Sequence, residues 1–468
     1  MEKKKKMGLI GVSALLFAIL FYKQEVAINF GILGLLTLGM IHFVLPKNKR
    51  DKQYYVLAIL VGLMSISQMW YADVYTFFAL SFSLLVLGTY IFFRRLNVLF
   101  YPFLLFANYV LFLYRFLSFE WLPKREGGGK RSWKKIIALV LFPALLAIVF
   151  FAVYSTGSSL FYDFIKKIKI SENTFYFIGV FLLGFLFYFN FWYPYIPRYL
   201  ILFNKRFKNE FGENNRDKLM ISEDLLDVEL QRTSGIITMV LLNLILLFFV
   251  ISYNYEQFFM LGEARNLSAD THTQINTIIY SIILAMCLIL LYFNSYFNFD
   301  EKAEKLKKLS YLWLILNSVL VLSAVFKTMQ YVGTYGLTTK RIGVFIFLLL
   351  CLVGMYYSYV KISQKKTNSF LVTKMTWVFF FTFTLNSMVN YSWVVTKYNL
   401  TFVEDVDIDY LYRLDYNIQL LHDYLKTHPE AEREYYGTFE WFANSQESNF
   451  KKPFLSQSLY YRYVNLED

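Results

Sequence analysis

Between two long apolar segments the chain reads Tyr331-Val-Gly-Thr-Tyr-Gly-Leu-Thr-Thr-Lys-Arg341, which is the least lipid-like sequence in its second half. Lys327 precedes this stretch, where a helix that begins near Tyr311 should leave a bilayer. Gly333 and Gly336 allow backbone conformations that other residues avoid, so a sharp reversal of the chain is expected here. The stretch therefore predicts a polar loop that joins two membrane-spanning helices.

The residue types leave two interpretations of this loop open. In the first, the loop folds back towards the helices and presents Tyr331, Tyr335 and Arg341 to a ligand or partner. In the second, it is a tight interfacial turn with tyrosines at headgroup depth and basic side chains that snorkel. Residue types alone favour the second, because tyrosine and basic residues are common at membrane interfaces.

The composition indicates a membrane protein. Hydrophobic residues make up 57% and aromatic residues 21% of the 468-residue chain, more apolar surface than a soluble fold can cover. Many of the apolar runs approach the roughly 20 residues needed to cross a bilayer. We predict an all-α polytopic helical bundle of about eleven spans with a small C-terminal helical appendage.

The formal net charge of +13 does not indicate a nucleic-acid partner. The lysines and arginines cluster in short loops between apolar runs, which is how membrane proteins mark their cytoplasmic side. No loop is long enough to form the basic surface that a nucleic acid needs. The lipid bilayer is the expected partner.

The positive-inside rule places the lysine-rich N-terminus in the cytoplasm. Residues 96–117 are apolar enough to cross, but the most basic loop of the chain follows them. We interpret 96–117 as an interfacial or re-entrant segment, which Pro102, Asn108 and Arg115 within it support. Whether 96–117 crosses stays open, and the sidedness of every later loop depends on it.

Four regions follow from this topology. They are an N-terminal four-span region (1–95), an interfacial segment with a basic cytoplasmic loop (96–135), a main transmembrane bundle (136–389) and an extracytoplasmic helical tail (390–468). The tail should form amphipathic helices, because its apolar residues recur at helical spacing: Leu411, Leu414, Ile418, Leu421 and Leu425. The predicted spans are 8–22, 26–45, 54–71, 75–93, 136–154, 175–193, 235–252, 277–293, 311–328, 342–360 and 371–389.

Residues for catalysis or metal binding are scarce. Cys287 and Cys351 lie within apolar runs, and the four histidines share no metal-ligand spacing. Residues 405–409 alternate aspartates, but without the glycine and distant glutamate of a calcium loop, so a helix cap is favoured over a cation site. We predict no catalytic residues, no metal and no cofactor, and we rank an enzyme last.

The polar groups inside predicted spans are amides, Asn243, Asn317 and Asn386, and no acidic residue lies mid-span. Acidic residues near the bilayer centre are typical of ion-coupled transporters, so their absence disfavours ion coupling. Asparagines in spans more often bond neighbouring helices than bind a solute. A passive or lipid-facing path lined by these amides remains the alternative.

Two patches carry a family resemblance. Tyr331, Tyr335-Gly336-Leu337-Thr338 and Arg341 after an apolar helix resemble a motif of the bacterial multi-pass family known as domain of unknown function 4153, a relative of 4173. Asn390, followed by Tyr398-Asn399-Leu400 and residues 407–411, resembles that family's segment after its last span.

Residues 133–164 further resemble the family's span followed by an amphipathic outer piece. Lys327 stands where the family would have an arginine, which keeps the charge but not the bidentate hydrogen bonding. The resemblance implies a protein of the bacterial cytoplasmic membrane. The family has no established activity, so the resemblance implies no catalytic role.

We expect the 331–341 loop to pack against residues 390–410 outside the membrane and to serve a sensing, signalling or interaction role. The partner would be a protein in the membrane or envelope. The alternative is a transporter or lipid-handling protein without ion coupling, with Asn243, Asn317 and Asn386 along its path. The candidate ligand or partner residues are Lys327, Tyr331, Tyr335, Gly336, Arg341, Asn390, Tyr398 and Asn399.

Overall fold

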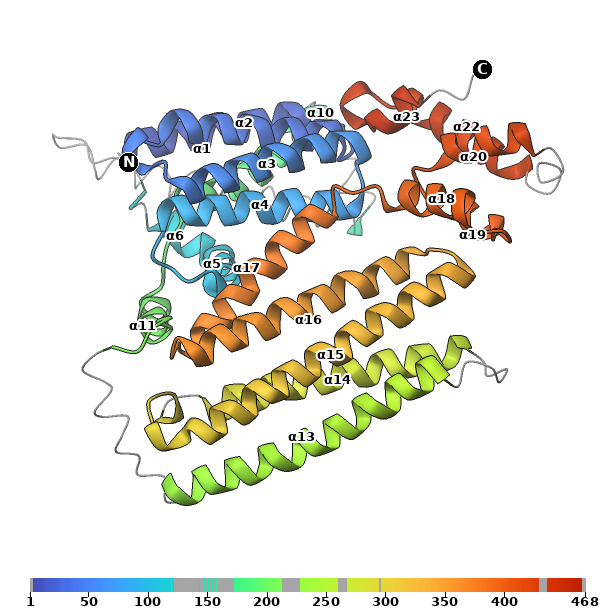
Figure 1. The fold of residues 1–468 in the computed structure, drawn as a ribbon. Coiled ribbons are helices and arrows are strands. Elements are labelled where there is room, and N and C mark those ends of the chain that lie inside the picture. The colour runs from blue at the N-terminus through green and yellow to red at the C-terminus, as the bar shows by residue number, and fades with distance from the viewer. Residues whose placement is uncertain are drawn as a thin grey trace. The chain divides into compact units, whose positions relative to one another are not determined.

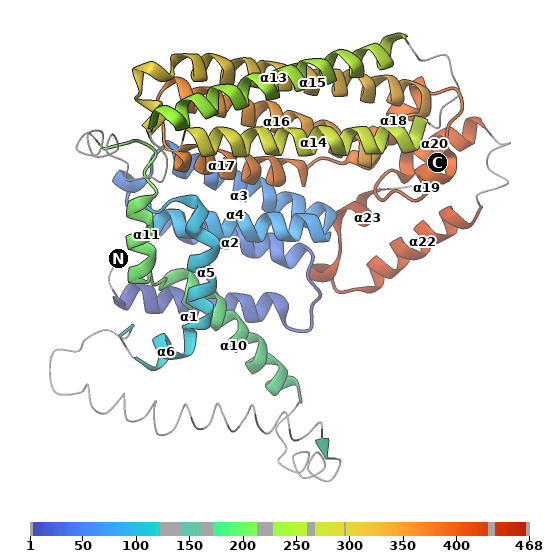
Figure 2. The same cartoon turned by 90° about the horizontal axis from the view of Figure 1, so that it is seen from below.

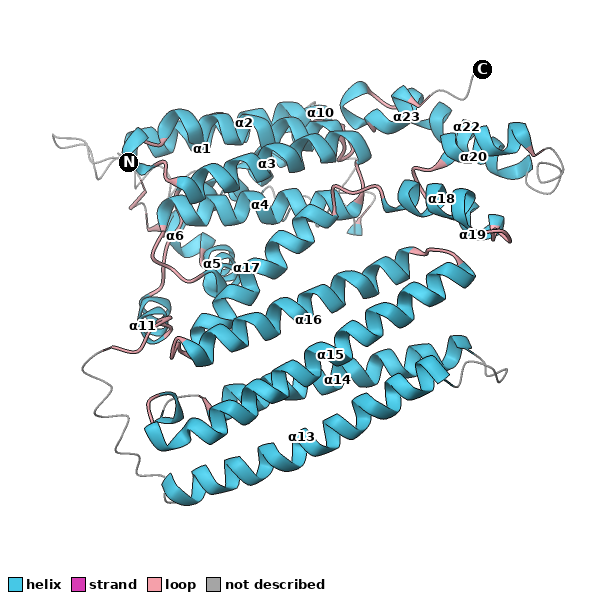
Figure 3. Cartoon of the chain, viewed as in Figure 1, coloured by secondary structure: helices cyan, strands magenta, loops and turns pink. Residues whose placement is uncertain are grey.

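The computed structural model describes residues 3–118, 120–121, 172–212, 228–259, 267–293, 296–428 and 436–464, together with isolated positions between 143 and 158. Every regular element in these ranges is a helix (Figures 1 and 3). The chain divides into two compact units. Unit 1 comprises residues 1–96, 100–202 and 444–464, and unit 2 comprises 97–99, 203–443 and 465–468.

Unit 1 is built on antiparallel helices that pack as α1 on α10, α2 on α3 and α3 on α4. Asp51 and Asp73 start α3 and α4 by accepting hydrogen bonds from the backbone N–H of Tyr54 and Thr76, at 3.0 and 2.7 Å. A short helix, α5, lies across the direction of α1 to α4 (Figure 2). The helices are α1 (Lys3–Phe21), α2 (Ile28–Val44), α3 (Lys52–Tyr71), α4 (Val74–Phe92), α5 (Tyr101–Val110), α6 (Phe112–Leu117) and α10 (Glu172–Trp192).

Residues 444–464, which we call the C-terminal strap, pack on the loop between α1 and α2. The Ser456 hydroxyl accepts from the Glu25 N–H at 2.9 Å and donates to the Gln24 side chain at 2.6 Å. Lys452 pairs with the Glu25 carboxylate at 2.7 Å. The strap includes the end of α22 (Tyr436–Lys451), then η6 (Phe454–Ser456) and α23 (Leu459–Tyr463).

Unit 2 is a second helical bundle in which α15 packs against α13, α14 and α16, and α16 packs against α17. Its core is a continuous apolar cluster that includes Met239, Ile282, Leu320 and Leu348. The helices are α13 (Val228–Phe259), α14 (Leu267–Tyr292), α15 (Glu304–Tyr335), α16 (Thr339–Ser363), α17 (Asn368–Asn386), α18 (Tyr391–Phe402), α19 (Ile408–Tyr412) and α20 (Ile418–Thr427), with η4 (Tyr296–Asn298) and η5 (Glu301–Ala303) before α15. Along the chain, the divisions between the units fall within two elements, α11 (Arg198–Arg206) and η2 (Val98–Phe100).

Within the described residues, six helices are long and apolar enough to cross a membrane: α3, α4, α10, α13, α15 and α16. The predicted count of about eleven spans is not confirmed. The helix predicted for 26–45, for example, has 17 residues, and at 1.5 Å per residue it is about 26 Å long, short of the ~30 Å hydrocarbon core. The predicted span 136–154 lies largely outside the described residues.

Two other expectations concern the segment 96–117 and the turn between α15 and α16. Residues 98–117 form the short helices η2, α5 and α6, with a break at Leu111. The hairpin tip is shorter than predicted, because α15 continues through Gly333 to Tyr335. The chain reverses at Gly336, whose φ is +75°, so of the two glycines at which a reversal was expected, Gly336 makes the turn and Gly333 stays helical.

The compact units have boundaries that differ from those of the four regions expected from the sequence. Of the expected main bundle, residues 203–389 belong to unit 2, whereas residues 172–202 belong to unit 1. The expected tail, 390–468, is also shared, because α18 to α20 belong to unit 2 and the C-terminal strap to unit 1. Amphipathic helices are present where the tail's apolar spacing predicted them, with Leu411, Ile418, Leu421 and Leu425 buried.

Candidate functional site: a fixed hairpin tip and an apolar cavity

The tip of the α15–α16 hairpin consists of Gly336, Leu337 and Thr338. The Thr338 hydroxyl accepts from the Arg341 N–H at 3.2 Å and caps α16. The Arg341 guanidinium turns back to bond the carbonyl oxygens of Tyr335 and Gly336 and lies 4.2 Å from the centroid of the Tyr331 ring. Arg341 thus closes the C-terminus of α15, where a cation is favoured by the exposed carbonyls.

The predicted contact between this tip and the segment after Asn390 is confirmed. The Asn399 side chain on α18 accepts from the Leu337 N–H at 2.6 Å and donates to the Leu337 carbonyl at 2.9 Å. The Tyr410 hydroxyl accepts from the Thr339 N–H at 2.9 Å. Leu337 also packs against an apolar cluster centred on Val395. We call this arrangement the hairpin clasp.

The other predicted ligand residues also have local contacts. Asn390 caps α18 by accepting from the Trp393 N–H at 2.9 Å and donates to the Tyr416 carbonyl at 2.8 Å. Tyr398 packs on Phe402, with ring centroids 5.2 Å apart. The Lys327 ammonium lies 5.4 Å from the centroid of the Tyr253 ring. These contacts explain how the side chains hold the unit together, and a ligand role for them stays a prediction.

The three embedded amides lie on different helices and bond mainly to their own. Asn243 donates to the Met239 carbonyl, Asn317 to that of Trp313 and Asn386 to that of Thr382, at 2.7, 2.8 and 2.6 Å.

Asn243 also donates to the Leu309 carbonyl of α15 at 3.0 Å. Among the described residues no hydrogen bond joins one of these amides to another. They act as ties within and between helices, and the arrangement gives no support to a path along them.

The alternating aspartates form a helix cap, as favoured from the sequence. The Asp407 carboxylate accepts from the Tyr410 N–H at 2.9 Å at the start of α19. Within the described ranges, no group of three histidine, cysteine, aspartate or glutamate side chains lies close enough to hold a metal ion.

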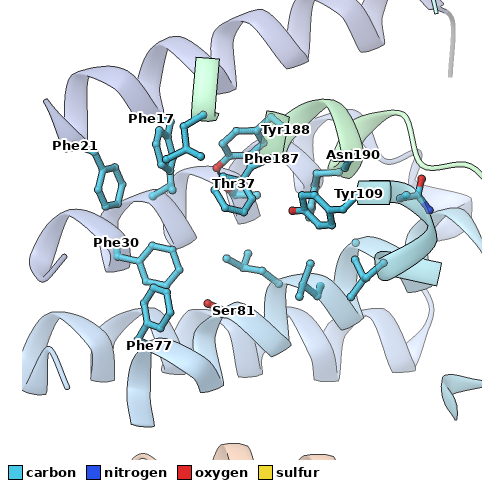
Figure 4. A pocket seen from close by; sticks show the side chains of 18 of the residues that line it. Phe17, Phe21, Phe30, Thr37, Phe77, Ser81, Tyr109, Phe187, Tyr188 and Asn190 are labelled. Carbon is cyan, nitrogen blue, oxygen red and sulfur yellow. Dashed lines mark hydrogen bonds between the residues drawn. The ribbon is translucent and has the colours of Figure 1, made fainter. Parts of the chain in front are cut away.

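A cavity of about 460 Å³ lies inside unit 1, walled by α1, α2, α4, α5 and α10 (Figure 4). One end is aromatic. Phe21, Phe30 and Phe77 meet there, with centroid distances of 6.4 Å between Phe21 and Phe30 and 4.9 Å between Phe30 and Phe77. Gln24 lines the same end and bonds the C-terminal strap.

The middle of the cavity is also largely apolar. The hydroxyls of Thr37 and Tyr188 bond each other at 2.6 Å, so neither needs a ligand. The lining of α4 runs from Phe77 to Thr89, which at 1.5 Å per residue is a length of about 18 Å.

The opposite end is polar. Asn108, Tyr109 and Asn190 line it, and the Tyr109 hydroxyl points into the cavity (Figure 4). Behind them lies Arg115, which is only 5% exposed and donates to the Asn190 side-chain oxygen at 2.8 Å. Burial lowers the pKa of Arg115 to about 10, and the group keeps its charge at neutral pH.

The sequence did not predict this cavity. In the sequence, Asn108 and Arg115 stand out only as departures from an apolar run, and the pattern does not single out Asn190. The available signal was one amide, Asn108, and one cation, Arg115, within a segment interrupted by Pro102.

Residues 11–421 match the model of a family described as Domain of unknown function (DUF4153). The match covers most of both units and confirms the resemblance inferred from the hairpin tip and the segment after Asn390. No curated protein and no solved structure matches the chain.

Proposed function

This chain belongs to the family described as Domain of unknown function (DUF4153), and we propose that it is a lipid-handling membrane protein that binds one single-chain amphiphile in the cavity of unit 1. The observation that carries the proposal is the cavity itself. Its volume of about 460 Å³ lies within the roughly 300–1,000 Å³ of small-molecule sites.

The distribution of polar groups supports an amphiphile rather than a compact solute. An apolar channel about 18 Å long leads from three phenylalanines to Asn108, Tyr109 and Asn190. A molecule that fills it needs an apolar chain for most of its length and a polar group at one end. This is the form of a fatty acid, a long-chain alcohol or a lysolipid.

We further propose that the chain resides in the bacterial cytoplasmic membrane with its N-terminus in the cytoplasm. One end of unit 2 is rich in basic residues. At this end Lys361 and Asn298 bond the Phe293 carbonyl, and Lys366 pairs with Glu210. The opposite end holds the hairpin clasp and the acidic residues 404–409. This asymmetry supports a cytoplasmic basic end and an extracytoplasmic clasp. The direction of α5, across α1 to α4, supports an interfacial position for 96–117.

The orientation is tested by single cysteines at Gly128, Thr334 and Ser448 in a background without Cys287 and Cys351. An impermeant thiol reagent applied to intact cells should label the second and third positions but not the first. Labelling of Gly128 alone would reverse the proposed orientation.

The second candidate function is a sensing or interaction role through the clasp and the tail. It is favoured by one observation: the clasp holds the tip in a fixed position and leaves aromatic side chains exposed beside it, including Tyr335 (52%), Trp393 (42%) and Phe402 (71%). We rank it second because the polar groups of the tip bond within the chain. It predicts that Tyr335→Ala weakens the binding of a protein partner without changing lipid binding.

The binding proposal is tested with the purified full-length protein in lipid nanodiscs and a photoreactive hexadecanol probe. Cross-links should map to residues that line the cavity on α1, α4 and α10. Ser81→Trp fills the cavity from α4 and should abolish these cross-links. Phe82→Trp is the matched control, because Phe82 is on the same helix but 45% exposed and outside the lining.

If the probe labels the wild type and Ser81→Trp equally, the cavity is not the binding site. Labelling confined to the lipid-exposed outer faces of the helices would also refute the proposal.

A further inference from the structure

We infer that the amphiphile carries a negative charge, which lies between Asn190 and Tyr109 in front of the buried Arg115. The inference rests on the proposed lipid-binding function and specifies the chemical class of the ligand. The shared chemistry is an anionic oxygen group, either the carboxylate of a fatty acid or the phosphate of a single-chain phospholipid.

The first step is the charge of Arg115. Its Nη1 donates to the Asn108 carbonyl at 3.3 Å and to the Asn190 side chain at 2.8 Å, and its Nη2 donates to the Tyr193 carbonyl. All these acceptors are neutral. Arg115 forms no ion pair with any carboxylate in the described part of the chain. A buried cation without a counter-charge is costly, and an anionic ligand would offset that cost.

The second step is the excess of donors. The Arg115 Nε–H is buried and has no acceptor among the described residues. Asn190 uses one amide N–H on the Leu186 carbonyl, which leaves the other free of the described acceptors. The Tyr109 hydroxyl likewise has no partner within the described ranges, and its ring is held by an edge contact with Phe187 at 6.0 Å.

The orientation of these groups favours an acceptor on the ligand. Arg115 already donates to the Asn190 side-chain oxygen, and the unused N–H of the same amide can donate to a ligand in the cavity. The Tyr109 hydroxyl can also donate a hydrogen bond to such a ligand. A carboxylate or phosphate accepts several such bonds, and charge-assisted bonds are about twice as strong as neutral ones.

The third step is the surrounding charge. The polar end of the cavity lies at the end of unit 1 where α1 begins and α10 ends, because the Lys6 ammonium is 5.2 Å from the centroid of the Tyr193 ring. Lys3 to Lys6 all lie in the first turns of α1. In the described part of the chain, the aromatic end has Lys23 and Lys452 rather than a run of four lysines, and Lys452 is paired with Glu25. The field along the cavity therefore favours an anion at the Arg115 end.

The test compares palmitate, hexadecyl phosphate and hexadecanol, which have the same chain length, as competitors of the photoreactive hexadecanol probe. The full-length protein is used in nanodiscs of a lipid without net charge. Palmitate or hexadecyl phosphate should compete at concentrations about tenfold lower than hexadecanol, the order expected for one partly screened charge in a medium of intermediate dielectric. The better of the two anions identifies the source of the group.

Arg115→Gln should weaken the binding of the two anions about tenfold more than the binding of hexadecanol. Arg115→Lys should restore most of the preference for anions. A structural effect would lower the affinity for all three molecules alike. If Arg115→Gln does not fold, Tyr109→Phe provides the second measurement, because it removes the hydroxyl and keeps the ring on Phe187. It should reduce the preference for anions severalfold.

The outcomes separate the two proposals. If none of the three molecules competes, the lipid-binding function fails and this inference with it. If all compete with equal affinity, the function stands and the anionic class is overturned. A preference for anions that persists in both Arg115→Gln and Tyr109→Phe also overturns the inference.

Discussion

Replacing Gly336 by alanine should destabilise unit 2 far more than the same substitution three residues earlier. Gly336 has φ +75° and ψ 173°, a backbone region that is essentially restricted to glycine and costs other residues about 1–3 kcal/mol. An added Cβ would also lie 2.8 Å from the Asn399 side-chain oxygen. Asn399 would have to move away from Leu337, and each weakened hydrogen bond costs about 1 kcal/mol.

Together these effects predict a loss of about 2–4 kcal/mol in the free energy of unfolding for Gly336→Ala. Gly333→Ala is the matched control. Gly333 lies within α15 and an added Cβ would meet nothing within 4 Å, so the alanine should stabilise the helix by up to about 1 kcal/mol.

The measurement is the unfolding of each purified variant in mixed micelles as the fraction of dodecyl sulfate is raised, followed by circular dichroism. Asn399→Ala should reproduce most of the loss of stability caused by Gly336→Ala. The double variant should lose less free energy of unfolding than the two single variants together, because both substitutions act on the same contact. A Gly336→Ala protein within about 0.5 kcal/mol of the Gly333→Ala protein would refute the account of the clasp.

Three further substitutions probe contacts elsewhere. Asp300→Asn removes the 2.7 Å ion pair with Arg232, in which the Arg232 side chain is 14% exposed and that of Asp300 6%. It should lower the free energy of unfolding by about 3 kcal/mol in the same assay. Ser456→Ala removes two hydrogen bonds between the C-terminal strap and the α1–α2 loop; limited proteolysis should then cleave the strap several times faster. Gly31→Ala places a Cβ 2.4 Å from a backbone oxygen of α3 and should lower stability by about 1–3 kcal/mol, whereas Gly39→Ala, in open space, should not.

The helical bundle could be predicted because a membrane imposes its length scale on the sequence. Apolar runs such as 235–252 and 342–360 needed no tertiary information. The clasp was also predictable, since residues 390–410 follow the last predicted span and must start near the same surface as the hairpin tip. The end of α15 was not, because glycine permits a turn without requiring one. Gly333 stays helical at a cost of about 1 kcal/mol, and the contacts of Asn399, Thr338 and Arg341 around the tip stabilise the turn at Gly336.

The cavity could not be read from the sequence, because an apolar residue on a helix looks the same whether it fills a core or lines a void. Phe30 and Phe77 satisfy the pattern of a packed interface. Whether the space between five helices closes depends on side-chain volumes and on helix directions, above all that of α5 across α4. Arg115 was visible in the sequence, but its function as a buried charge became apparent only once Asn190 and Tyr193 were placed around it.

The charge distribution links the proposed orientation to the proposed ligand. In unit 1 the polar end of the cavity coincides with the lysine-rich start of α1, which the positive-inside rule assigns to the cytoplasm. An anionic amphiphile bound there would have its head at the depth of the cytoplasmic headgroups and its chain along α4 towards the far leaflet. That is also its arrangement in the inner half of a bilayer, so it could enter the cavity without turning over. The ligand should therefore be drawn from the cytoplasmic leaflet, and probe added to that side of sealed vesicles should reach Arg115 first.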